Sequence, residues 1–97
     1  MRYPPKIVLC APLTDKEALE PFVEKCLRDQ VVLIAVVGDG CRHVEDLIDE
    51  ITVGDGSDQS RFIVTTSHPT ESIEAVLEFA THWPCEDGRD GVAKIEL

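Results

Sequence analysis

The stretch that most constrains this chain is a run of seven aliphatic residues, 31–37, which ends at Gly38-Asp39-Gly40. Valine and isoleucine make up most of this run, and both residue types favour strands over helices. A strand with one face in water alternates polar and apolar residues, whereas this run does not alternate. It therefore predicts a strand that is buried on both faces and that needs helices above and below its sheet.

Three further segments have the character of strands. Residues 6–11 and 61–66 are rich in aliphatic and β-branched residues, and Pro12 ends the first of them. Residues 92–97 alternate apolar and polar side chains, unlike the other strands. This alternation predicts a strand that lies at an edge of the sheet or has one uncovered face.

Amphipathic segments between the strands predict three helices. Apolar residues recur at helical spacing in residues 14–27, 41–51 and 69–83. Pro21 interrupts the first of these, because a proline inside a helix lacks the backbone N–H and clashes with the preceding turn. We therefore expect either a kink, or a short turn over residues 15–19 with the main helix starting near Pro21.

The alternation of strands and helices with short connections predicts a single α/β domain of 97 residues. This is a three-layer βαβαβαβ fold with a four-stranded, mostly parallel sheet and right-handed crossovers. The order 2-1-3-4 is favoured, a truncated flavodoxin-like or Rossmann-like arrangement. It would place the first helix on one face of the sheet and the other two helices on the opposite face. Apolar surface left uncovered beside the single helix would favour a homodimer.

The charge of the chain narrows the classes of partner. Nine basic and 19 acidic residues give a formal net charge of −10. This charge argues against nucleic acid and against anionic membrane surfaces, because proteins bind both through cations. A basic protein partner is compatible with it. The chain has no run of about 18 apolar residues, which is the length needed to span a membrane. Residues 1–6 lack a signal-peptide pattern, so a cytoplasmic location is expected.

The four cysteines, Cys10, Cys26, Cys41 and Cys85, have spacings that match no zinc-binding or CxxC pattern. Cys10 and Cys26 fall at apolar positions, where a thiol behaves as a small hydrophobic side chain. We therefore expect reduced thiols rather than two disulfides. The sequence predicts neither a metal site nor a cofactor.

Open parallel sheets bind ligands beyond the carboxyl ends of their strands, where the strand order reverses. With the order 2-1-3-4, this crevice would lie between the loops after the first and third strands, with the loop after the second strand beside it. The candidate ligand-binding residues there are Thr14, Asp39, Cys41, His43, Thr66, Ser67 and His68. They predict a small-molecule or nucleotide binder, although hydroxyl groups ahead of the third helix could equally cap it.

Cys41 is also a candidate nucleophile. It lies at a predicted helix N-terminus beside Arg42 and His43, a setting in which thiols are often reactive, and Asp39 could orient the imidazole. The alternative is a first-turn residue without a chemical role. Because no complete set of nucleophile, base and oxyanion donors can be assembled, a minimal thiol/His enzyme ranks last among the hypotheses.

The helix over residues 41–51 carries four carboxylates within six residues, Glu45, Asp46, Asp49 and Glu50. Two pairs of them have like charges at i, i+4, which destabilises a helix. Asp49 and Glu50 also approach the C-terminal end, where the helix dipole disfavours negative charge. These residues form either a solvated face or a docking surface for a basic protein partner. The leading hypothesis is a non-catalytic protein-binding or accessory module.

Overall fold

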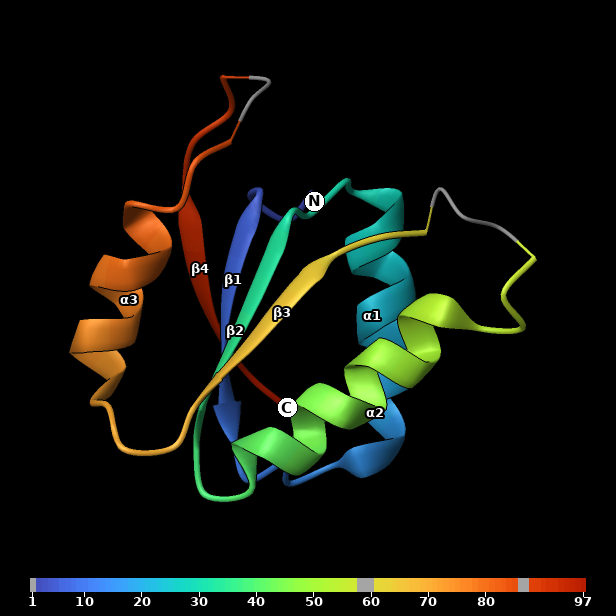
Figure 1. Cartoon of the computed structure of the whole chain (residues 1–97), viewed down its shortest axis with the longest axis horizontal. Helices are drawn as coiled ribbons and strands as arrows, with labels where there is room; N and C mark the ends of the chain where they lie inside the picture. The colour runs from blue at the N-terminus through green and yellow to red at the C-terminus, as the bar shows by residue number, and fades with distance from the viewer. Residues whose placement is uncertain (1, 58–60, 86–87) are drawn as a thin grey trace.

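The computed structural model describes residues 2–57, 61–85 and 88–97 (Figure 1). Strands and helices alternate along the chain as the sequence predicts, and a short 3-10 helix precedes the first α-helix. The elements are β1 (Lys6–Ala11), the 3-10 helix (Lys16–Ala18), α1 (Leu19–Arg28), β2 (Leu33–Gly38), α2 (Cys41–Val53), β3 (Val64–His68), α3 (Ile73–Thr81) and β4 (Val92–Glu96). They form a three-layer α/β fold in which a parallel sheet lies between helices.

The sheet has the strand order β3-β2-β1-β4, and every pair of neighbouring strands is parallel. The predicted order 2-1-3-4 is therefore wrong. It would have placed β3 between two neighbours, although Thr65, Thr66 and Ser67 make this strand polar. Strands in the middle of a parallel sheet are buried and apolar, and the two aliphatic strands, β1 and β2, occupy the centre.

The helices are distributed differently from the prediction: α1 and α2 cover one face of the sheet, and α3 covers the other (Figure 1). The expectation that the first helix would stand alone followed from the wrong strand order. Because β2 and β3 are each added on the same side of the preceding strand, two right-handed crossovers put α1 and α2 on the same face. The chain then returns across the sheet through α3 and places β4 beside β1.

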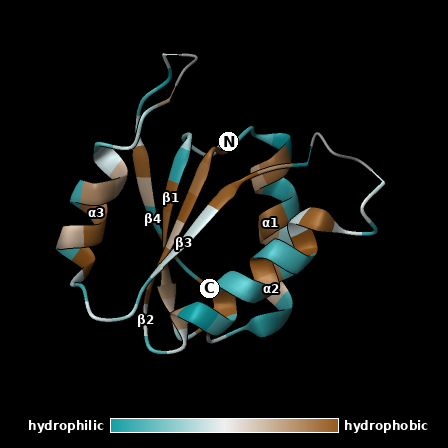
Figure 2. Cartoon of the chain, viewed as in Figure 1, coloured by the Kyte–Doolittle hydropathy of each residue, from teal (hydrophilic) through white to brown (hydrophobic). Residues whose placement is uncertain are grey.

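Two hydrophobic cores fill the spaces between these layers. Side chains alternate along a strand, so Ile7 and Leu9 of β1 face α1 and α2, whereas Val8 faces α3. The same alternation divides β2, which is buried on both faces as residues 31–37 predict. Figure 2 shows hydrophobic residues concentrated on the strands and hydrophilic residues along the visible side of α2.

β4 lies at an edge of the sheet, as its alternating sequence predicts. Ala93 and Ile95 pack against the core under α1 and α2, while Lys94 and Glu96 are exposed. Through their register with β1, the two charged residues lie on the face that α3 covers alone. The polar side of this strand therefore belongs to the face with the single helix.

The start of α1 follows the second of the two predicted alternatives. The 3-10 helix Lys16–Ala18 precedes α1, whose first residue is Leu19, so Pro21 lies in the first turn of α1. The first N–H groups of a helix have no acceptor within that helix. A proline at this position therefore removes no helical hydrogen bond.

Several predicted boundaries shift along the chain, and the two largest shifts are at the starts of β3 and α3. β3 begins at Val64 instead of residue 61, and α3 begins at Ile73 instead of Pro69. Ser72 caps α3, because its hydroxyl oxygen accepts a hydrogen bond from a backbone N–H of the first turn. The hydroxyl groups of β3 therefore do not cap α3, which was the alternative role that the sequence suggested for them.

Two glycines form the turn from β2 into α2. Gly38 has a φ of +107°, and a Cβ atom built on it would lie 2.2 Å from the carbonyl oxygen of Ala11 in β1. Gly40 has a φ of +77°, and no described atom lies within 4 Å of the corresponding position. Both conformations favour glycine, and at Gly38 the neighbouring strand also leaves no room for a side chain.

Candidate partner-binding site

An open hollow of about 470 Å³ lies where α1 meets the C-terminal end of α2. Its lining residues are Glu20 and Glu24 of α1, Glu50, Ile51 and Gly54 at the end of α2, and Arg61 ahead of β3. A second hollow of about 350 Å³ shares Glu50 and Gly54 with the first and adds Asp49 and Val53. Since they share residues, the two hollows adjoin, and we call them together the acidic groove.

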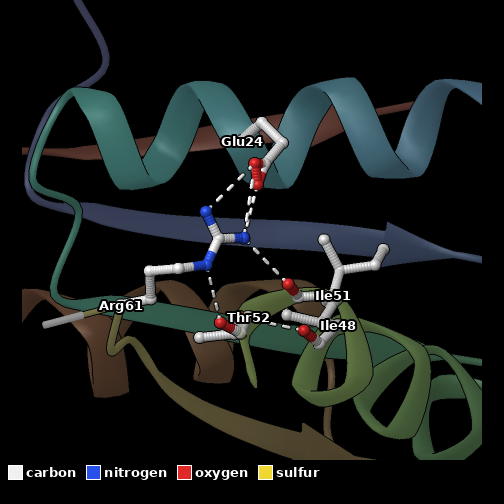
Figure 3. A network of polar contacts seen from close by, with 5 residues as sticks. All are labelled: Glu24, Ile48, Ile51, Thr52 and Arg61. Atoms are coloured by element: carbon white, nitrogen blue, oxygen red, sulfur yellow. Dashed lines mark hydrogen bonds and ion pairs between the residues drawn. The ribbon is translucent and has the colours of Figure 1, made fainter. Parts of the chain in front are cut away.

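Arg61 organises the polar contacts of the acidic groove (Figure 3). Its Nε donates a hydrogen bond to the carbonyl oxygen of Thr52 at 3.1 Å, and a terminal guanidinium nitrogen donates to that of Ile51 at 2.9 Å. The same guanidinium group forms a salt bridge with the carboxylate of Glu24 in α1. Arg61 thus connects α1, α2 and the segment before β3, and it places positive charge where the dipole of α2 favours it.

The carboxylates of the acidic groove differ in their partners. The hydrogen bond from the Arg61 guanidinium lowers the pKa of the Glu24 carboxyl group below its ordinary value. Glu20, Asp49 and Glu50 are exposed and form no ion pair within residues 2–57, 61–85 and 88–97. These three carboxylates give the groove a negative charge that a cationic partner could reach.

One exposed apolar side chain lines the acidic groove, and a second directly follows a lining residue in the chain. Val53, which lines the second hollow, is 58% exposed, and Phe62, which directly follows Arg61, is 72% exposed. Protein interfaces combine apolar residues that lose water with polar residues around them. The rim of the groove therefore offers both kinds of contact to a partner.

The four predicted partner-binding residues of α2 do not share one direction. Successive residues of an α-helix are rotated by about 100°, so Glu50 lies on the flank toward α1, where it lines the acidic groove. Glu45 and Asp49 lie on the flank toward β3, where Asp49 also borders the second hollow of the groove. Asp46 lies on the outer side of the helix, between the two flanks. Glu45 is partly buried, and the other three are exposed. α2 therefore presents carboxylates both toward α1 and toward the edge strand β3.

The predicted ligand-binding residues do not gather in one crevice. β2 lies between β1 and β3, so the loops after β1 and β3 are not neighbours, and the crevice expected from the order 2-1-3-4 does not form. Thr14 instead binds the segment after β4: its backbone N–H and its Oγ1 donate to the carbonyl oxygen of Leu97 at 2.7 and 2.5 Å. Asp39 and His43 are exposed, in the turn before α2 and in its first turn.

Cys41 faces the core rather than solvent. It is 1% exposed and packs between the sheet and the helices α1 and α2. Cys10, Cys26 and Cys41 are free thiols, and burial raises the pKa of the Cys26 thiol to about 12. A nucleophilic cysteine has to be accessible to its substrate, and the position of Cys41 does not provide that access.

His68 is an enclosed residue at the end of β3. Its side chain is 8% exposed, and both ring nitrogens have partners, with Nε2 2.8 Å from Thr66 Oγ1 and Nδ1 2.8 Å from Glu71 Oε1. The ring packs edge-on against Phe79 of α3, with the centroids 4.8 Å apart. Ser67 lies on the opposite face of the strand. These contacts fasten the end of β3 to α3.

Comparison with known protein families gives an assignment. The family model described as "Domain of unknown function (DUF7684)" matches residues 3–92. The chain belongs to the DUF7684 family. The match runs from the segment ahead of β1 to the first residue of β4, so it includes α1, α2 and the whole acidic groove. No curated protein and no solved structure matches the chain.

Two features are missing from the part of this DUF7684 domain that the structure describes. None of its helices has both the length and the apolar character needed to cross a membrane. Among the same residues, no three His, Cys, Asp or Glu side chains are grouped so that they could hold a metal ion.

Sequence patterns reveal only part of the acidic groove of this DUF7684 domain. The composition of α2 points to Asp49 and Glu50, but Glu20 and Glu24 give no signal beyond their i, i+4 spacing on a polar helix face. Arg61 is nine residues beyond Thr52, and no helical period connects the two. The tertiary structure is what brings the two helices and Arg61 together.

Proposed function

We propose that this DUF7684 domain is a non-catalytic protein-binding module that recognises a basic partner through the acidic groove and the adjoining face of α2. The observation that carries the proposal is that carboxylates from two helices line the first hollow, Glu20 and Glu24 from α1 and Glu50 from α2, while Asp49 of α2 lines the adjoining hollow. Val53 adds apolar surface in the second hollow, and the exposed Phe62 directly follows Arg61 in the chain.

The charge of the whole chain supports the same partner chemistry. A net charge of −10 attracts cationic surfaces over a distance and does so more strongly at low salt. Lysine and arginine side chains can form charge-assisted hydrogen bonds with the carboxylates of the groove. Exposed ion pairs contribute only about 0–1 kcal/mol each, so much of the affinity has to come from apolar contact at the rim. We therefore expect a partner that presents basic residues beside an apolar one.

The two alternative functions suggested by the sequence have less support. A small molecule or nucleotide at the carboxyl ends of the strands would need the loops after β1 and β3 to be neighbours, and β2 separates them. The acidic groove would repel the phosphate groups of a nucleotide. A thiol enzyme would need Cys41 to reach its substrate, and Cys41 is buried.

Capture from an extract of the native host, followed by titration of the purified partner, tests this proposal. The test variant, Glu20→Lys/Glu50→Lys, reverses two charges of the groove. The matched control, Glu74→Lys/Glu78→Lys, makes the same change in net charge at exposed positions of α3, on the other face of the sheet. We expect the test variant to bind at least about tenfold more weakly, because lost attraction and new repulsion together exceed about 1.4 kcal/mol.

The control variant should bind the partner as the unmodified chain does, and the affinity of both should fall as salt is added. Circular dichroism of each variant separates a loss of binding from a loss of folding. Equal binding by the two variants, or a captured partner without a basic surface, would contradict the proposal.

A further inference from the structure

β3 has an open edge along which another strand could pair. It is the outermost strand on one side of the sheet. In the parallel ladder with β2, the N–H of Val64 donates to the carbonyl oxygen of Val32. Alternate residues of a strand direct their backbone groups to opposite sides. The N–H and C=O groups of Thr65 and Ser67 therefore point away from β2, out of the sheet.

The two edges of the sheet are protected to different degrees. β4 carries the charged residues Lys94 and Glu96, and charged side chains on an edge strand discourage pairing with another chain. β3 has the sequence VTTSH, with no Asp, Glu, Lys or Arg. Its residues 64–67 are half-buried, and the exposed Phe62 stands just ahead of them. Of the two edges, β3 is the one that favours an added strand.

The charges of α2 select what can pair with β3. α2 packs against β3 and lies along that side of the sheet (Figure 1). The flank of α2 that faces away from α1 carries Glu45 and Asp49, with Arg42 one turn earlier. A second copy of the chain paired antiparallel through β3 would bring together two such flanks, each with two carboxylates and one arginine, and their net negative charges would repel each other. A basic segment would meet opposite charge at the same place.

We infer that β3 accepts an extended basic segment of the partner as an added fifth strand. The inference rests on the proposed function and specifies how the basic partner binds. Main-chain hydrogen bonds to Thr65 and Ser67 would hold the segment in register. Because side chains alternate between the two faces of a strand, basic residues at every second position would face Glu45 and Asp49.

The remaining residues of the added strand would lie on the face covered by α3. Val64 and Thr66 of β3 are half-buried on that face, and Val64 packs against the core under α3. Apolar side chains therefore fit the intervening positions. One end of the segment would lie beside Phe62, which follows Arg61 of the acidic groove. The edge of β3 and the groove would then form one continuous surface.

Nuclear magnetic resonance of the isotope-labelled chain, titrated with an alternating lysine–valine peptide with blocked ends, tests this inference. The backbone amides of Thr65 and Ser67 should shift on titration. They should also exchange with solvent at least about tenfold more slowly, because the added strand hydrogen-bonds to both residues. The amide of Thr66, which already bonds to β2, is the internal control and should gain far less protection.

A variant separates the main-chain contacts from the charges. Ser67→Pro removes an outward N–H without removing a bond between β2 and β3, and an edge strand tolerates proline in this orientation. It should bind the peptide at least about tenfold more weakly, whereas Ser67→Ala, which keeps the N–H, should bind normally. If Ser67→Pro does not fold, peptides N-methylated at alternate residues replace it: one methylation pattern should abolish binding and the other should preserve it.

Several results would overturn the inference. Shifts confined to α2, with Thr65 and Ser67 unchanged, would exclude strand addition and leave the acidic surface of the proposed function standing. Failure of the peptide to bind at low salt, or a dimer of the chain formed through β3 and seen by sedimentation, would also exclude it. The comparison of Glu20→Lys/Glu50→Lys with its control does not depend on these results, so the two proposals can fail separately.

Discussion

Replacing Gly38 by alanine should destabilise this domain far more than the same replacement of Gly40. Both glycines have a positive φ, +107° and +77° respectively. At Gly38 the new Cβ would lie 2.2 Å from the carbonyl oxygen of Ala11, whereas at Gly40 no described atom lies within 4 Å. The two variants therefore separate the cost of the backbone conformation from the cost of the steric contact.

The magnitude follows from these two terms. A positive φ costs an alanine about 1–2 kcal/mol, and the smaller freedom of alanine in the unfolded chain offsets about 0.4–1 kcal/mol of this. At Gly38 the ends of β1 and β2 must also separate by at least an ångström before Cβ reaches ordinary van der Waals contact. Overpacking of this kind costs about 1–3 kcal/mol. We expect a loss of about 2–4 kcal/mol for Gly38→Ala and of about 1 kcal/mol or less for Gly40→Ala.

Thermal and urea unfolding followed by circular dichroism measure both losses. For a domain of this size, 1 kcal/mol corresponds to about 4–8 °C, so Gly38→Ala should lower the Tm by roughly 10–25 °C and Gly40→Ala by less than about 8 °C. The dependence of the unfolding free energy on urea concentration should stay the same, because neither change alters the surface exposed on unfolding. Equal losses at the two positions would refute the steric argument.

Two further predictions concern ionisable side chains. Glu24→Gln should lower the Tm by a few degrees at pH 7 and by much less at a low pH, below the folded-state pKa of Glu24. The reason is that the Arg61 contact lowers the folded-state pKa of Glu24, so its stabilisation is present above the unfolded-state pKa and lost as the pH falls through the folded-state value. Glu20→Gln is the control, and an equal loss at both pH values would contradict this account. Cys26 and Cys41 should be alkylated by iodoacetamide only as fast as the chain opens, because both are buried and the pKa of Cys26 is raised to about 12. Mass spectrometry measures this rate, and rapid labelling of Cys41 in the folded chain would restore the thiol hypothesis.

The central strands could be predicted from the sequence because of how they are buried. β1 and β2 have apolar neighbours on both faces, so double-sided burial leaves a continuous aliphatic run. The alternation of β4 indicated an edge for the same reason. The strand order could not be derived, because the right-handed crossover rule relates the face of each helix to the direction in which the chain moves along the sheet but does not fix that direction. The hydroxyl-bearing residues of β3, Thr65, Thr66 and Ser67, carry the missing information, since they mark the second edge.

The acidic part of the groove could be predicted more readily than the basic part. Asp49 and Glu50 are close in sequence to the other carboxylates of α2, so their concentration is visible without a structure. The role of Arg61 depends on the return of the chain beyond the end of α2. The same return explains why β3 begins at Val64 instead of residue 61. The Arg61 side chain donates a hydrogen bond to the carbonyl oxygen of Thr52 in α2, and Arg61 lies ahead of the strand.

The two helices that line the groove end in different ways. α1 has Lys25 and Arg28 in its own last turn, where basic residues match the helix dipole. Lys25 forms an i, i+4 salt bridge with Asp29, at 2.8 Å, and so neutralises a nearby carboxylate of the same segment. α2 has no basic residue in its last turn and takes its cation from Arg61.

This difference bears on the choice between a solvated face and a docking surface on α2. A lysine in the last turn of α2 would match the dipole, but it would also pair with Asp49 or Glu50 through i, i+3 or i, i+4 contacts. Arg61 instead reaches the backbone carbonyl of Ile51 and the carboxylate of Glu24 in α1. The end of α2 is thus stabilised while its own carboxylates keep their charge at the surface. A surface that binds a basic partner, as we propose, would use the carboxylates that this arrangement leaves at the surface.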